Sequence, residues 1–117
     1  MQYDFESLKV WQGGMNLVKK VYKLTEKLPK EELYGLVSQM KRAAVSIPSN
    51  IAEGKGKQYK KEYIQALYIA KGSLFEEMTL IHLSANLGYV SMDEKMEILA
   101  SCSEVIAMLS GLIKVLK

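Results

Sequence analysis

The stretch QMKRAAVSIPSNIAEGKGKQYKKEY, residues 39–63, changes character halfway along. In its first half, apolar residues recur at steps of three and four, which predicts a helix with one apolar face. Those residues are Met40, Ala44, Ile47 and Ile51. The helix is predicted to end at Gly54, and lysines crowd the sequence beyond that point.

Pro48 lies inside this predicted helix. A proline has no N–H to donate to the carbonyl of Ala44, and its ring crowds that carbonyl, at a cost of ~3 kcal/mol or more. We therefore expect a kink in the helix at Pro48. Ser46 and Ser49 flank the proline and are expected to help satisfy the backbone groups that it frees.

Three further segments carry the same helical spacing. They cover residues 7–27, 59–87 and 91–116. Ser7 and Ser91 are suitable N-caps for the first and last of them, while Pro29 and Gly88 follow the ends of the first two. Because the connections are short and little β-type alternation competes, the pattern predicts an all-α, antiparallel up-down four-helix bundle.

Length and composition agree with one soluble domain. The chain has 117 residues, of which 49% are hydrophobic and 25% charged, so a single domain over residues 1–117 with a short N-terminal extension at residues 1–6 is expected. The start, MQYDFESL, lacks an apolar signal core, and the purely apolar runs fall short of the ~20 residues of a membrane span. We expect a cytoplasmic protein with no membrane partner. Cys102 is the single cysteine and is expected in the core.

The last predicted helix is more apolar than a monomeric bundle needs. Its predicted core stripe is Met92, Met96, Leu99, Ser103, Ile106, Leu109, Ile113 and Leu116. Four more apolar residues lie off that stripe, namely Val105, Met108, Leu112 and Val115. A helix that is apolar all round must be covered all round, so these four are the predicted contacts with further copies of the chain. The alternative is a broad core stripe with a few tolerated exposed residues.

Arg42 is the only arginine among fifteen lysines, and it lies on the polar face of the proline-containing helix. Glu77 falls inside the apolar stripe of the following helix, where a buried acid needs a partner. One hypothesis is an ion pair between Arg42 and Glu77, within or between chains, with Glu76 and Glu53 as alternative acids. The other interpretation places Arg42 in solvent and Glu77 at the edge of the stripe.

The block GLVSQMKRAAVSIPSNIAEGKGK resembles a known family, as do AKGSLFEEMTLIHLSANLGYV after it and LKVWQGGMNLVKKVYKLTEKLPKEELYGL before it. The chain is similar to small four-helix-bundle proteins encoded in intervening sequences of bacterial large-subunit rRNA genes. It also resembles the accessory variability determinant proteins of diversity-generating retroelements. The resemblance covers roughly residues 5–113, and its motif is matched at Arg42, Ser46, Pro48, Asn50, Glu53 and Gly54.

The resemblance implies a homo-oligomer, typically a barrel-shaped pentamer. In the retroelement branch it also implies a basic surface that binds nucleic acid and a reverse transcriptase. This chain departs from the strongly basic branch, since its net charge is +3 and it has one arginine.

Residues for catalysis or metal binding are sparse. His82 is the only histidine, and Thr79 stands where a Glu-x-x-His iron motif would need its acid. A metal-type Cys/His cluster is absent from the sequence, and GKGK at residues 54–57 lacks the full phosphate-loop pattern. The sequence therefore predicts a protein that is not an enzyme and needs no cofactor or metal.

Four lysines follow the proline-containing helix. This lysine cluster is Lys55, Lys57, Lys60 and Lys61. Residues 54–75 hold five lysines against one acid, Glu62, a local net charge of +4. Lysines bind phosphate without sequence preference and Tyr59 could stack on an unpaired base, so RNA or single-stranded DNA is one expected partner. A solvated loop is the other interpretation, and the protein would then be a scaffold that contacts only protein.

Overall fold

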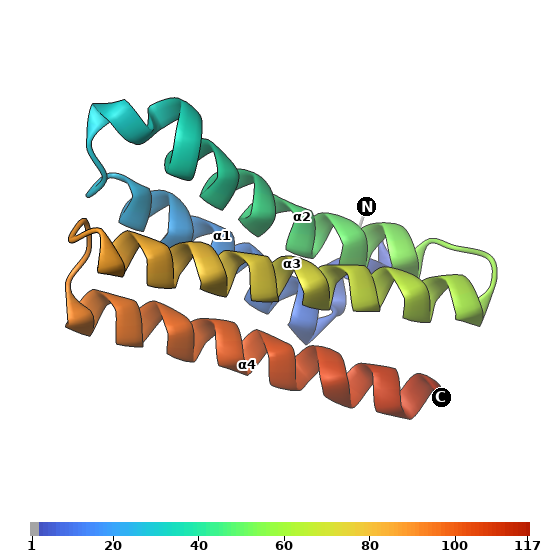
Figure 1. Cartoon of the computed structure of the whole chain (residues 1–117). Coiled ribbons are helices and arrows are strands. Elements are labelled where there is room, and N and C mark those ends of the chain that lie inside the picture. The colour runs from blue at the N-terminus through green and yellow to red at the C-terminus, as the bar shows by residue number, and fades with distance from the viewer. Residues whose placement is uncertain (1–2) are drawn as a thin grey trace.

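The computed structural model describes residues 3–117, and four α-helices run through them (Figure 1). They are α1 (Lys9–Thr25), α2 (Ser38–Lys55), α3 (Lys60–Asn86) and α4 (Met92–Leu116). α2 packs against α1 and α3, and α4 packs against the same two helices, in a body of 43 × 24 × 22 Å. The predicted all-α fold of four helices is confirmed.

The connections place successive helices antiparallel. A 3-10 turn (Lys30–Glu32) and a π-helical turn (Leu33–Val37) join α1 to α2. Figure 1 shows this connection at the same end of the molecule as the link between α3 and α4. The link between α2 and α3 lies at the opposite end, where α4 also terminates. The lysine cluster therefore lies at the end of the molecule that also holds the C-terminal part of α4.

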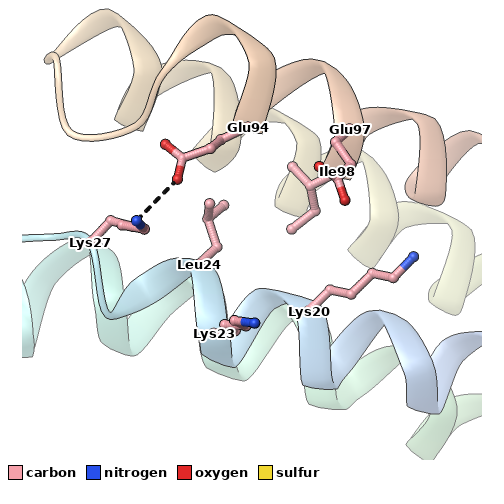
Figure 2. Close-up of a pocket in the computed structure, with 7 residues that line it drawn as sticks. All are labelled: Lys20, Lys23, Leu24, Lys27, Glu94, Glu97 and Ile98. Atoms are coloured by element: carbon pink, nitrogen blue, oxygen red, sulfur yellow. Dashed lines mark ion pairs between the residues drawn. The ribbon is translucent and has the colours of Figure 1, made fainter.

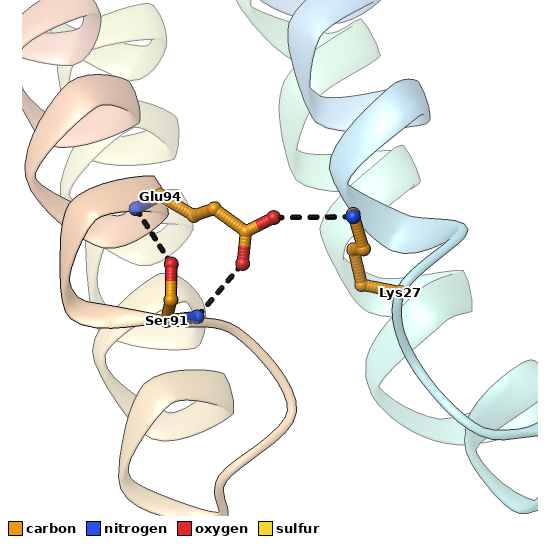
Figure 3. Close-up of polar contacts among 3 residues, drawn as sticks. All are labelled: Lys27, Ser91 and Glu94. Carbon is orange, nitrogen blue, oxygen red and sulfur yellow. Dashed lines mark hydrogen bonds and ion pairs between the residues drawn. The ribbon is translucent and has the colours of Figure 1, made fainter.

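The start of α4 is set by Ser91, as predicted (Figure 3). Its Oγ accepts a hydrogen bond from the Glu94 N–H at 3.0 Å, and its own N–H donates to the Glu94 carboxylate at 2.8 Å. This reciprocal cap satisfies two helix-end donors. The hydrogen bonds from Ser91 lower the pKa of Glu94, with a further contribution from the Lys27 ammonium 3.4 Å away on the segment after α1.

The predicted cap at Ser7 is wrong. α1 begins at Lys9 with Leu8 as its N-cap, and Leu8 has no side chain that could accept a hydrogen bond. Ser7 instead closes a short 3-10 helix, Asp4–Ser7, by donating from its Oγ to the Asp4 carbonyl at 2.9 Å. Phe5 packs edge-on against Trp11 with ring centroids 5.2 Å apart, so the short 3-10 helix is docked on α1.

α2 and α3 bury the apolar stripes that the sequence predicts. In α2 the predicted Met40, Ala44, Ile47 and Ile51 are all buried. The buried side of α3, on which Glu77 lies as predicted, also includes Tyr63, Leu67, Ala70, Leu74, Ile81 and Ser84. The two helices approach closely at Gly54, where a Cβ would lie 2.6 Å from the Cβ of Ala66. A side chain at this position would have to push α3 away from α2.

The predicted stripe of α4 is rotated relative to the observed one. The buried residues of α4 are Ile98, Cys102, Val105, Leu109 and Ile113. Met92 and Met96, which were predicted in the core, are 64% and 58% exposed. Because the second half of α4 is apolar nearly all round, its periodicity does not define which face turns inward. Cys102 is buried, as expected.

Pro48 is buried within α2, and the helix continues on both sides of it. Ser46 Oγ hydrogen-bonds to the Ala43 carbonyl at 2.8 Å, and Ser49 Oγ donates to the Val45 carbonyl at 2.8 Å. The two serines thus bond to the carbonyls on either side of Ala44 rather than to Ala44 itself. The bend of the helix axis expected at Pro48 stays a prediction.

Candidate nucleic-acid interface

The lysine cluster is carried by the end of α2, the loop after it and the first turn of α3. All four lysines are exposed, and the side chain of Tyr59 beside them is 62% exposed. Tyr59 is the N-cap of α3 but provides no side-chain hydrogen bond to the helix end. The first N–H groups of α3 and the positive end of its dipole therefore add to the charge of the lysines.

The cluster has two sides that differ in charge. Toward α2, Lys57 and Lys61 border a hollow of about 540 Å³ that Glu53 and Glu62 also line. Toward α4, Lys60 and Lys61 border a hollow of about 370 Å³, and no Asp or Glu side chain of residues 3–117 lines it. The side facing α4 is therefore the more favourable one for a polyanion.

Tyr63 belongs to the core rather than to the exposed cluster. Its side chain is 8% exposed, its hydroxyl is buried without a hydrogen-bond partner, and burial raises its pKa. The ammonium of Lys55 lies 5.7 Å from the centre of its ring, close enough for a cation–π contact. Tyr59 and not Tyr63 is thus the aromatic ring of the cluster that could stack on a base.

The proposed ion pair of Arg42 with Glu77 does not form within the chain. Arg42 is exposed on α2, whereas Glu77 is fully buried. Glu53 and Glu76, the alternative acids, are exposed, and the ion pair found within residues 3–117 is that of Lys27 with Glu94. Since Glu77 has no exposed surface, an arginine from a second chain could not reach it in this conformation either.

Glu77 is a carboxyl group in an apolar environment. Both of its oxygens are buried without a hydrogen-bond partner. Burial, with a smaller contribution from the nearby charge of Glu76, raises the pKa of Glu77 to about 8. Burial and the charge of Glu77 together raise the pKa of the Cys102 thiol to about 12. Both groups are therefore mainly protonated at neutral pH, and the thiol is a poor nucleophile.

A second lysine-rich surface lies between α1 and α4, in a groove of about 310 Å³ (Figure 2). Figure 2 shows lysines of α1 and the segment after it facing the glutamates of α4 across the groove. Lys27 pairs with Glu94, Lys20 donates to Ser101 Oγ at 2.8 Å, and Glu97 adds another acid. This mixed charge makes the groove a poorer phosphate site than the lysine cluster.

The residues predicted to contact further chains lie in different environments. Val105 is 2% exposed and belongs to the core, so its assignment to an interface is wrong. Met108 and Leu112 are half-buried and pack against the core. Val115 is 82% exposed. The observed uncovered apolar side chains of α4 are Met92, Met96 and Val115, two of which the sequence placed in the core.

α4 is long and apolar enough, by length and composition alone, to cross a membrane. Only 28% of its most apolar 18-residue stretch is buried inside the chain. A single helix of this kind is weak evidence for membrane insertion, since core helices of soluble proteins pass the same test. Because so little of this stretch is buried, α4 carries apolar surface that the other three helices leave uncovered.

The four packed helices define the chain as a small all-α bundle protein with a basic end. Residues 3–117 contain no group of side chains that could hold a metal ion. A family model described as 23S rRNA-intervening sequence protein matches residues 6–111, and the chain belongs to this family. The family resemblance predicted from the sequence is confirmed. None of the curated proteins compared with the chain matches it.

A solved structure supports the fold. It is the crystal structure of a protein of unknown function from the S23 ribosomal protein family of Bacteroides thetaiotaomicron VPI-5482. The two chains are 21% identical and superimpose with a TM-score of 0.80, over 90% of this chain and 98% of the other. At this level of identity the likeness concerns the fold.

Proposed function

We propose that this protein is a cytoplasmic, non-enzymatic adaptor that forms a homo-oligomer and binds RNA or single-stranded DNA weakly through the lysine cluster. The observation that carries this proposal is the exposure of all four lysines and of Tyr59 at one end of the molecule. Cations held on rigid helix ends attract phosphates, and an exposed aromatic ring can stack on a base.

Self-association would strengthen such binding. The uncovered Met92, Met96 and Val115 favour assembly, because large exposed apolar surface is unusual on a monomer. We expect an assembly larger than a dimer, with five chains as the number that the family resemblance implies. In a closed ring each copy of the lysine cluster would be repeated around one axis, so later phosphate contacts would become intramolecular.

Light scattering tests the assembly. At micromolar concentration we expect a particle several times the chain mass of 13.2 kDa. The double variant Met92→Glu/Met96→Glu should dissociate it, whereas Lys19→Glu/Lys23→Glu, on exposed positions of α1, should not. A parent particle of 13.2 kDa would contradict the proposal.

Fluorescence anisotropy with a labelled oligouridine of about ten nucleotides tests binding. We expect affinity to fall steeply between about 50 and 200 mM salt, since phosphate contacts release counterions. Replacing the lysine cluster with Gln should abolish binding. The matched control replaces four other exposed lysines with Gln and removes the same charge: Lys9, Lys19, Lys23 and Lys30. Equal binding by the cluster variant and the parent would contradict the proposal.

A scaffold that contacts only protein is the second candidate. The exposed apolar residues of α4 favour it, since they suit a protein partner as well as another copy of the chain. The same titration separates the two functions, because a protein-only scaffold would bind no oligonucleotide at low salt.

A further inference from the structure

Two neighbouring hollows lie along α3 and the C-terminal part of α4, and together they are called the groove here. The hollow of about 370 Å³ beside Lys60 and Lys61 adjoins a second hollow of about 260 Å³. Tyr68 and Lys117 line both hollows, so the two meet at these residues. Each is near or below the lower end of the volumes typical of small-ligand pockets, which suits a segment of an extended chain.

The charged side chains that line this groove are of one sign. Lysines line it along its length: Lys60, Lys61, Lys71, Lys114 and Lys117. No Asp or Glu side chain of residues 3–117 lines either hollow, and the ion pair of the described chain, Lys27 with Glu94, lies elsewhere. The groove between α1 and α4 is a direct contrast, because there the lysines face glutamates (Figure 2).

Tyr68 stands where the two hollows meet and is 42% exposed. The ammonium of Lys117 lies 2.8 Å from its hydroxyl oxygen and 5.2 Å from its ring centre. The cation is therefore beyond the hydroxyl rather than over the middle of the ring. An aromatic ring with a neighbouring ammonium combines the two contacts that unpaired nucleotides use, stacking for the base and charge for the phosphate.

We propose that this groove holds a single-stranded nucleic acid, with Tyr68 stacking on a base and Lys71, Lys114 and Lys117 contacting phosphates. The inference rests on the proposed function and extends that site from the lysine cluster along α3. Lys60 and Lys71 are separated by roughly 16 Å along the helix, which leaves room for about three to five nucleotides. A duplex should bind less well, because its bases are already stacked on one another.

The test uses the full chain and the labelled oligouridine, titrated at several salt concentrations. The groove variant Lys71→Gln/Lys114→Gln/Lys117→Gln should bind at least about tenfold more weakly, and its slope of log K against log salt should be shallower by about 2. The control Lys9→Gln/Lys19→Gln/Lys23→Gln removes the same charge from α1 and should match the parent within about twofold. Tyr68→Ala should weaken binding about tenfold, whereas Tyr68→Phe, which keeps the ring, should match the parent.

The outcomes separate this inference from the proposed function. If the cluster variant loses binding while the groove variant and Tyr68→Ala bind like the parent, the groove is overturned and the proposed function stands. If the groove variant and Tyr68→Ala lose binding while the α1 triple variant and Tyr68→Phe bind like the parent, binding in the groove is supported. If the parent binds no oligonucleotide at low salt, both are overturned. Circular dichroism and light scattering on every variant check that the substitutions leave the fold and the assembly unchanged.

Discussion

α3 carries charges in two opposite situations. At its start the lysine cluster faces solvent, while Glu77, roughly 25 Å further along the helix, is fully buried without a hydrogen-bond partner. The exposed ammonium groups remain hydrated and charged, so they stay available to a polyanion. The buried carboxyl has neither water nor a cation to stabilise its charge, so it takes up a proton instead. Ionisable side chains of one helix thus stay charged and exposed at its start, whereas the buried Glu77 makes stability depend on pH.

The largest expected effect concerns Glu77. Its folded pKa of about 8 lies above the ordinary value of 4.5, so between these values the folded chain holds a proton that the unfolded chain has released. Stability should therefore fall as pH rises from about 4.5 to about 8 and then level off, by on the order of 5 kcal/mol in total. The charged or titratable groups acting on this carboxyl are Glu76 and Cys102, neither of which is a cation.

Denaturant unfolding at pH 5, 7 and 9 and at one fixed protein concentration measures this effect. The variant Glu77→Gln keeps the side-chain volume without the titration, so its stability should depend much less on pH. Glu76→Gln is the matched control, because that neighbour is exposed and should leave most of the dependence in place. A parent whose stability is the same at the three pH values would show that Glu77 finds a partner in solution.

A smaller effect on stability is expected at Pro48 in α2. Pro48→Ala restores a backbone hydrogen bond but removes the packing of the ring against Gly14, where a Cβ would lie 3.6 Å from the proline Cδ. These changes oppose each other, so helicity should hold and stability should change by less than about 2 kcal/mol. If the proline bends α2 for subunit packing, light scattering should show a weaker assembly. An unchanged assembly would mean that Pro48 does not shape the interface.

The smallest effect is expected at Arg42. Because this side chain is exposed and makes no ion pair in the chain, Arg42→Ala and Arg42→Lys should each change the free energy of unfolding by less than about 0.5 kcal/mol. The ion-pair hypothesis requires a loss of about 3–5 kcal/mol for the alanine variant, since a buried charge would be stranded. Denaturant midpoints of the two variants distinguish these results.

The sequence predicted the buried stripe of α2 well because that helix has a polar face that contrasts with its apolar one. It failed on the rotation of α4, where Val105 turned inward, because the stretch from Val105 to Leu116 is apolar nearly all round and can turn several faces to the core. Glu77 was placed correctly in the apolar stripe, but the need for a partner was overstated, since protonation removes the charge.

The groove beside the lysine cluster was missed for a different reason. Tyr68 and Lys117 are 49 residues apart in the sequence, and only the packing of α3 against α4 brings them together. Spacing along one helix can reveal residues that share a face, but it does not identify residues of a second helix that complete a site. Neighbouring lysines such as Lys60 and Lys61 were visible because they belong to one short segment.

Photo-crosslinking tests where nucleic acid lies on the molecule. A single strand of about ten nucleotides that carries 4-thiouridine is irradiated with the full chain at about 50 mM salt, and crosslinked peptides are identified by mass spectrometry. The account predicts crosslinks in residues 55–71 and 110–117, with Tyr59 and Tyr68 as the main sites, and their loss at about 200 mM salt. Crosslinks confined to α1, or none at low salt, would contradict it.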